Sequence, residues 1–108
     1  MKDLKLTEEC CVTVHSIENA KILVKAYGIP SVITITGDPS EADHVVHCEW
    51  GRLFSKVAHD FTGFSWGYGG EGPRGLYVFL FEICHKSKVT PGFISNLELQ
   101  PGETRTLY

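Results

Sequence analysis

The sequence predicts an α+β fold: a small, mainly antiparallel sheet with two packed helices at about residues 16–27 and 73–86. Two patterns lead to this prediction. Residues 32–36 and 44–50 are β-prone runs of the kind that form strands. The two helical segments carry apolar residues at helical spacing or on nearly every side. Because 108 residues suffice for one ordinary core and are too few for two, we expect a single domain over residues 1–108.

The first predicted helix follows a β-prone run, CCVTV, at residues 10–14. Ser16 is a suitable N-cap, and the apolar residues after it recur close to every 3.6 positions. Gly28, with Pro30 beyond it, stands where such a helix ends. The sequence therefore predicts a helix over residues 16–27.

The strand predictions concern the middle and the end of the chain. Residues 32–36 are β-branched and run into turn residues at 37–40, and the run at 44–50 is a candidate hairpin partner for them. The tail, residues 87–108, contains two Pro-Gly turn signals between short apolar runs. We expect it to pack on the fold as an extra strand or as an extended arm.

The second predicted helix begins at Pro73, because proline lacks the N–H that has no partner in the first turn of a helix. Residues 74–86 are apolar on nearly every side, which is typical of a helix at the buried centre of a fold. A strand over residues 76–83 is the alternative, since a short apolar run does not separate the two by period.

Composition narrows the class of protein. The formal net charge of −3 and the absence of a basic run argue against general nucleic-acid binding. No stretch approaches the ~18 apolar residues of a membrane span, and the start lacks the apolar region of a signal peptide. We therefore expect a cytoplasmic protein. Without a secretion signal or a C-x-x-C pair, the four cysteines are expected to be free thiols, buried as small apolar groups.

No metal site or reaction class is predicted. The histidines and cysteines lack zinc-site spacing. His59 and Asp60 could be a base with its orienting carboxylate, although sequence neighbours usually point in different directions. We therefore expect a binding protein without a cofactor, rather than an enzyme.

The segment 63–76, GFSWGYGGEGPRGL, is the most unusual part of the sequence. Residues 67–72 fit G-x-G-x-x-G by letter, but the acidic residue expected ~20 positions further on in a dinucleotide-binding fold is missing. A glycine-rich turn ahead of a helix still exposes backbone N–H groups at the positive end of the helix dipole. Such a turn can bind an anion, or Glu71 and Pro73 can simply cap the helix.

Aromatic rings alternate with small residues in the same segment. If the segment is extended, Phe64, Trp66 and Tyr68 point to one side. That side either packs in the core or forms a platform on which a base or a partner side chain stacks. Of the three rings, we expect Tyr68 to be the most exposed.

Residues 63–76 resemble the signature of the DUF6166 domain, a small uncharacterised family of phage and mobile-element genomes, and Ser65, Glu71, Arg74 and Gly75 depart from it. The matching positions are Gly63, Phe64, Trp66, Gly67, Tyr68, Gly69, Gly70, Gly72, Pro73 and Leu76. The resemblance implies a phage or mobile-element context, in which small domains counter host defences. It implies no activity.

Together these observations predict a phage-type binding protein that sequesters a nucleotide-like signal of a bacterial defence system. The predicted ligand-binding residues are Trp66, Tyr68, Gly69, Gly70, Glu71, Gly72 and Arg74. The first alternative is an acidic inhibitor of a host defence protein, such as an anti-CRISPR. The second is a small enzyme, which would require His59, Glu71 and Arg74 to converge. The aromatic platform could equally be the face of a homo-oligomer.

Overall fold

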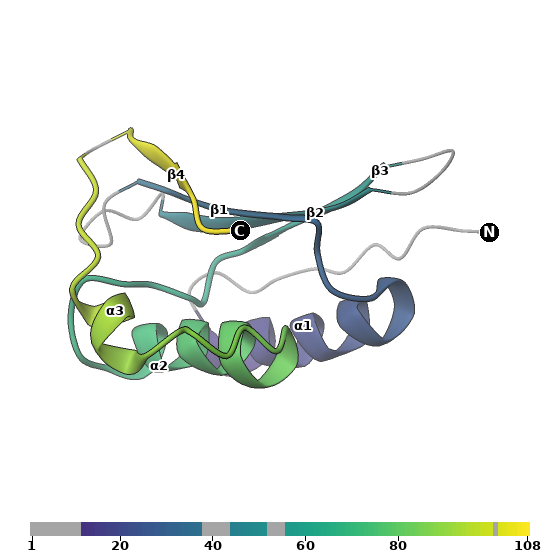
Figure 1. Cartoon of the computed structure of the whole chain (residues 1–108), viewed down its shortest axis with the longest axis horizontal. Helices are drawn as coiled ribbons and strands as arrows, with labels where there is room; N and C mark the ends of the chain where they lie inside the picture. Colours follow the sequence, from purple (N-terminus) through teal and green to yellow (C-terminus); the bar gives the residue numbers. More distant parts are fainter. Residues whose placement is uncertain (1–11, 38–43, 52–55, 101) are drawn as a thin grey trace.

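The computed structural model describes residues 12–37, 44–51, 56–100 and 102–108. A sheet forms one layer and the helices form the other, on one face of that sheet (Figure 1). This arrangement confirms the predicted α+β fold. The elements in chain order are α1 (Thr13–Tyr27), β1 (Val32–Thr36), β2 (Val45–Gly51), β3 (Lys56–Phe61), α2 (Glu71–Tyr77), the π-helix η1 (Val78–Ile83), α3 (Pro91–Ser95) and β4 (Thr104–Thr106).

The sheet has the strand order β3-β2-β1-β4, and every neighbouring pair is antiparallel. The predicted hairpin of β1 and β2 is confirmed, with Thr34 opposite His47. The tail supplies β4, so the extra-strand reading of residues 87–108 is confirmed at Thr104–Thr106. Side chains alternate along β1 and β2, because successive residues of a strand point to opposite faces. The inward set packs under the helices.

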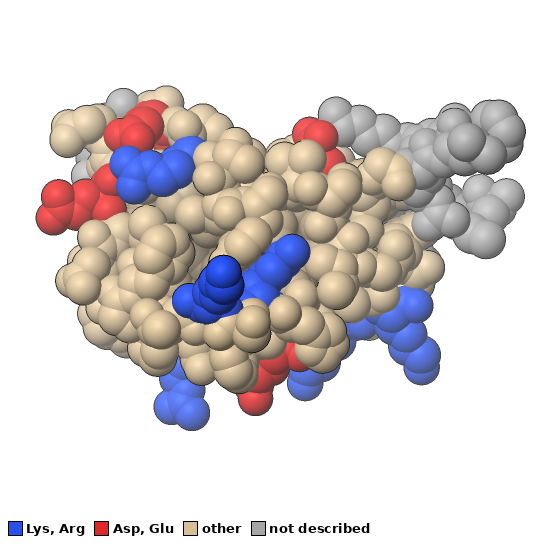
Figure 2. Space-filling model, in the orientation of Figure 1, with Lys and Arg blue, Asp and Glu red and all other residues tan. Residues whose placement is uncertain are grey.

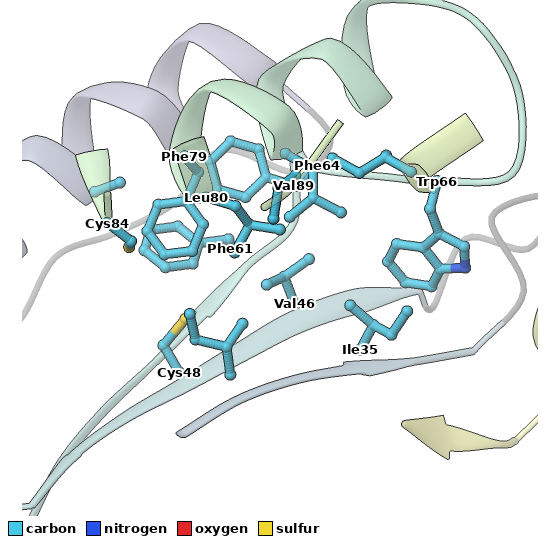
Figure 3. Close-up of a cluster of buried hydrophobic side chains, with 14 of the residues drawn as sticks. Ile35, Val46, Cys48, Phe61, Phe64, Trp66, Phe79, Leu80, Cys84 and Val89 are labelled. Atoms are coloured by element: carbon cyan, nitrogen blue, oxygen red, sulfur yellow. The ribbon is translucent and has the colours of Figure 1, made fainter. Parts of the chain in front are cut away.

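The core lies between the sheet and the helices and centres on three neighbouring aromatic rings (Figure 3). Phe61, Phe64 and Phe79 have ring centroids 5.1 to 5.3 Å apart. Such pairs contribute about 0.5–1.5 kcal/mol each beyond the area they bury. Cys48 and Cys84 are buried thiols in the same core, as predicted, and burial raises the pKa of Cys84 to about 12.

Helix α1 begins at Thr13, so the predicted start at Ser16 is wrong. The hydroxyl of Ser16 accepts a hydrogen bond from the N–H of Gly63 (2.9 Å), and that of Thr13 donates to the carbonyl of Gly63 (2.8 Å). Both side chains therefore hold the glycine segment against α1, and neither caps the helix. The β-prone run at residues 10–14 forms no strand at residues 12–14, because α1 begins at Thr13, and residues 10–11 lie outside the described part. The predicted end at Gly28 is confirmed, with φ +88°.

The second helix is confirmed, and with it the helical reading of residues 76–83. It begins at Glu71, two residues before the predicted Pro73, and passes from α2 into η1 without a break. It ends at Ile83, so the predicted end at residue 86 is three residues too late. Proline is tolerated anywhere in the first turn, because the N–H groups there have no partner in the helix. The carbonyl of Gly70 accepts the first helical hydrogen bond, from the N–H of Arg74 (3.1 Å).

Two elements were not predicted from the sequence. Strand β3 pairs along its length with β2, and α3 begins where the Pro-Gly signal at residues 91–92 indicated a turn. The hydroxyl of Thr90 caps α3 by accepting a hydrogen bond from the N–H of Phe93 (3.1 Å). Among the described helices, none has the length and apolar character needed to cross a membrane.

Candidate functional site

The glycine segment leaves β3, passes around the end of the helix layer beside α3 and enters α2 (Figure 1). Three contacts fix its path. Gly63 is bound to α1 as described above, and the N–H of Ser65 donates to the carbonyl of Gly72 (3.2 Å). The N–H of Gly67 donates to the carbonyl of Ile94 in α3 (3.0 Å). The segment is therefore held by both α1 and α3.

Several of its glycines are required by packing. A Cβ atom on Gly72 would lie 2.1 Å from Ser65 Oγ, and one on Gly75 would lie 2.4 Å from a methyl carbon of Thr13. Gly67 has φ +86°, a conformation that side chains disfavour. Packing and backbone conformation therefore explain why these three positions are glycine. The glycine at position 72 does not require a bound ligand as its explanation.

The alternating rings divide between the core and the surface. Phe64 and Trp66 are fully buried. The side chain of Trp66 therefore has no exposed surface with which to make the predicted contact to a ligand. Trp66 Nε1 has no hydrogen-bond partner among the described residues, and the ring packs edge-on against His44. Tyr68 is 49% exposed, as the sequence indicated, and its hydroxyl lies 2.9 Å from Ser65 Oγ.

A groove of about 500 Å³ lies between the glycine segment, α2 and α3. Its volume falls in the range of small-molecule sites, ~300–1,000 Å³. It brings together four of the predicted residues, Tyr68, Gly69, Gly70 and Arg74. Trp66, Glu71 and Gly72 are not among its lining residues. The rest of the lining was not predicted and consists of Pro73, Tyr77, Pro91, Gly92 and Ser95.

Two glycines of this groove have no packing requirement. A Cβ atom on Gly69 or Gly92 would meet nothing within 4 Å, and neither residue has a left-handed φ. The fold would therefore accept a side chain at both positions. Because both line the groove, a large side chain at either would narrow it.

The groove carries one positive side chain. Arg74 is exposed, and no carboxylate of the described residues forms an ion pair with it. Among the described residues, no side chain caps the N-terminus of α2 at Gly70, where the first N–H groups of a helix have no partner within the helix. Glu71 is exposed in the same turn and reduces the positive potential there.

Aromatic surface continues out of the groove along the helix. The ring of Tyr77 lines the groove and stacks on Phe81, with centroids 5.3 Å apart and planes 12° from parallel. Phe81 is 38% exposed. Tyr77 follows Arg74 by three residues, so the two share a helix face. That spacing could have identified Tyr77 from the sequence, whereas the lining from α3 depends on tertiary contacts.

The enzyme alternative receives no support from the geometry. His59 packs its ring on Phe61, and neither it nor Glu71 lines the groove with Arg74. Asp60 instead faces His47 across the sheet, with His47 Nδ1 2.5 Å from Asp60 Oδ1. His47 Nε2 lies 2.8 Å from Glu49 Oε2. Partial burial alone would lower the pKa of His47, but the two carboxylates outweigh it and raise that pKa.

The sequence analysis did not identify this histidine between two carboxylates, because Asp60 lies on a different strand from His47 and Glu49. The strand period places His47 and Glu49 on one face of β2, and the register sets Asp60 opposite His47. Within the described ranges, no group of three or more His, Cys, Asp or Glu side chains could hold a metal ion.

Comparison of the chain with protein-family models, with curated proteins and with solved structures finds no match. The resemblance of residues 63–76 to the DUF6166 domain therefore stays a prediction. The fold and the groove are the basis on which a function can be argued.

Proposed function

We propose that this chain is a non-enzymatic binding protein and that its groove takes a nucleotide-like small molecule. One observation carries the proposal: the groove combines aromatic rings, a cation with no ion pair among the described residues, and glycines that the fold does not need. These residues are Arg74, Tyr68, Tyr77, Gly69 and Gly92. Side chains at the two glycine positions would occupy space that a ligand can use.

Each part of a nucleotide has a counterpart in the groove. A phosphate would accept charge-assisted hydrogen bonds from Arg74 and further bonds from the main chain at Gly69 and Gly70. A base would stack on Tyr77 or Tyr68, a contact worth about 1–3 kcal/mol per base. The carboxylate of Glu71 beside this wall disfavours a second phosphate group. The groove therefore suits a ligand with few negative charges.

The biological role follows from the resemblance of the glycine segment. In a phage or mobile-element context, a small protein that binds a nucleotide-like signal tightly would lower its free concentration. Such sequestration would silence a bacterial defence system that depends on the signal. The role requires binding and no chemistry.

A second candidate function is binding to a host defence protein, as an anti-CRISPR protein does. The observation that favours it is the aromatic surface beside the groove, where Phe81 is 38% and Phe93 45% exposed. Exposed aromatic rings are enriched at protein interfaces. In this case the groove would receive a side chain of the partner.

The first test is thermal unfolding of the protein with a panel of linear and cyclic nucleotides. A ligand at 100 times its dissociation constant adds about 2.7 kcal/mol to the free energy of unfolding. In a domain of this size that corresponds to a rise in Tm on the order of 10 °C. Arg74→Ala should abolish the rise. Arg105→Ala should retain it, because Arg105 lies on β4, is paired with Glu103 and does not line the groove.

The nucleotide proposal is wrong if no member of the panel raises Tm, or if Arg74→Ala and Arg105→Ala respond alike. The protein-binding alternative predicts a different result. A partner purified with the chain from a host lysate would be lost on Phe81→Ser or Phe93→Ser, whereas no nucleotide would compete with it.

A further inference from the structure

A second, smaller pocket lies beyond the C-terminal end of η1, separate from the groove. It has a volume of about 240 Å³ and shares no lining residue with the groove. Its lining consists of His85, Lys86, Ser87, Lys88 and Tyr108. Four of these residues are consecutive, so one short turn supplies most of the pocket.

The backbone at this turn has an unusual conformation. His85 has φ +58°, and it alone among the described non-glycine residues has a positive φ. The N–H of Lys86 donates to the carbonyl of Leu80 (2.8 Å), and that of Cys84 donates to Phe79 (2.9 Å). These bonds close the π-helix, and His85 follows its C-cap in the left-handed conformation that glycine, or sometimes asparagine, usually adopts just beyond a helix end.

A histidine at this position is therefore unfavourable for the fold, and glycine would be better. Strained residues of this kind persist where the side chain serves a purpose. His85 lines the pocket together with two lysines. Lysines after a helix also interact favourably with its dipole, but that effect needs neither a pocket nor a strained histidine.

The charge in the pocket is positive and partly fixed in place. Lys86 Nζ lies 4.7 Å from the centroid of the Tyr108 ring, which is 38% exposed. This cation–π contact restrains the ammonium group without neutralising it. Within the described part of the chain, no carboxylate forms an ion pair with Lys86 or Lys88. Lys and Arg side chains occupy the middle of this face of the molecule (Figure 2).

We propose that this pocket is a binding site for a phosphate group. Lys86 and Lys88 would supply the charge, while His85 and the hydroxyls of Ser87 and Tyr108 would act as hydrogen-bond donors. The volume is smaller than the ~300 Å³ at which small-molecule pockets begin. The pocket therefore suits a single tetrahedral oxyanion, either free phosphate or the phosphate end of a monoester.

The test is titration of the full chain with orthophosphate and with glycerol 3-phosphate at constant ionic strength, followed by amide chemical shifts. We expect the amides of residues 85–88 and 108 to shift in a saturable way. Saturation by both probes would show that the pocket accepts monoesters, and saturation by orthophosphate alone would assign it to free phosphate. Shifts confined to residues 69–74, or no saturable shift, would overturn the proposal.

Two variants make the test specific. Lys88→Ala should weaken phosphate binding about tenfold, which is typical of losing one charge-assisted bond. Lys21→Ala on α1 changes the net charge equally and should leave the affinity unchanged. His85→Gly should raise Tm by a few degrees and yet weaken phosphate binding. Equal affinities in Lys88→Ala and Lys21→Ala, or an unchanged affinity in His85→Gly, would contradict the proposed site.

Discussion

The hydroxyl of Tyr68 lies 2.9 Å from that of Ser65, and this contact holds the exposed ring of the glycine segment at the edge of the groove. Ser65 also donates its N–H to Gly72, whose missing side chain leaves room for the Ser65 hydroxyl. The segment therefore combines two kinds of glycine. One kind lets the chain pack, and the other leaves the groove open.

The two kinds of glycine predict opposite responses to the same substitution. In Gly72→Ala the new methyl group would lie 2.1 Å from Ser65 Oγ, so we expect a loss of about 1–3 kcal/mol in the free energy of unfolding. Gly69→Ala meets nothing within 4 Å and should be neutral or stabilising by about 0.4–1 kcal/mol. Chemical denaturation of both variants measures the difference. A loss of stability in Gly69→Ala would contradict the conclusion that the fold does not need glycine at position 69.

A groove-filling substitution separates the ligand site from the fold. Gly92→Leu places a large side chain at the wall supplied by α3, in space where a Cβ atom has no neighbour. We expect Tm without ligand to change by less than about 4 °C, the shift that corresponds to ~1 kcal/mol in a domain of this size. The rise in Tm with a nucleotide should disappear. If the rise survives in this variant, the ligand lies elsewhere.

The histidine between two carboxylates predicts a pH dependence of stability. The pKa of His47 in the folded protein is above its ordinary value of 6.5, so the protonated form stabilises the fold. This stabilisation is complete below pH 6.5 and is lost as the pH rises through the folded-state pKa. The free energy of unfolding should therefore fall as the pH rises above 6.5.

His47→Asn is the variant that isolates this effect. It removes the titrating group, so its free energy of unfolding should fall less over the same pH range. Asp60→Asn should also reduce the slope, because it removes one of the two carboxylates that contact His47. The same slope in His47→Asn as in the unmodified chain would show that another group causes the pH dependence.

The buried thiol of Cys84 predicts chemical inertness. Burial raises the pKa of Cys84 to about 12, so almost none of it is thiolate near neutral pH. We expect iodoacetamide to leave Cys84 unmodified in the folded protein and to modify it after denaturation. Peptide mass spectrometry distinguishes it from the other cysteines. Rapid labelling of Cys84 in the folded state would contradict its place in the core.

The sequence predicted the elements whose local signals agree with the fold. The β-branched run of β1 and the apolar stretch of the second helix both form as expected. The start of α1 was wrong because Ser16 bonds to Gly63, far along the chain, and does not cap the helix. Strand β3 was missed because its sequence, KVAHDF, has one β-branched residue, Val57, and has His59 and Asp60 between Val57 and Phe61.

For a similar reason, only one wall of the groove could be predicted from the sequence. The wall that contains Tyr68, Gly69 and Gly70 follows from the glycine segment itself. The opposite wall comes from α3, which is joined to the segment by the hydrogen bond from Gly67 to Ile94. No local sequence pattern predicts such a tertiary contact. The alternating pattern of rings and small residues placed Trp66 and Tyr68 on the same side of an extended chain. The two rings separate because the segment turns at Gly67.

The central claim is that the groove between the glycine segment, α2 and α3 binds a nucleotide-like ligand. The most direct measurement is amide chemical-shift mapping of the full chain with the same panel of nucleotides. The account predicts saturable shifts at Gly69, Gly70, Arg74 and Gly92 with at least one of them, and none in Arg74→Ala. Saturable shifts confined to other surfaces, or none with any nucleotide, would contradict it.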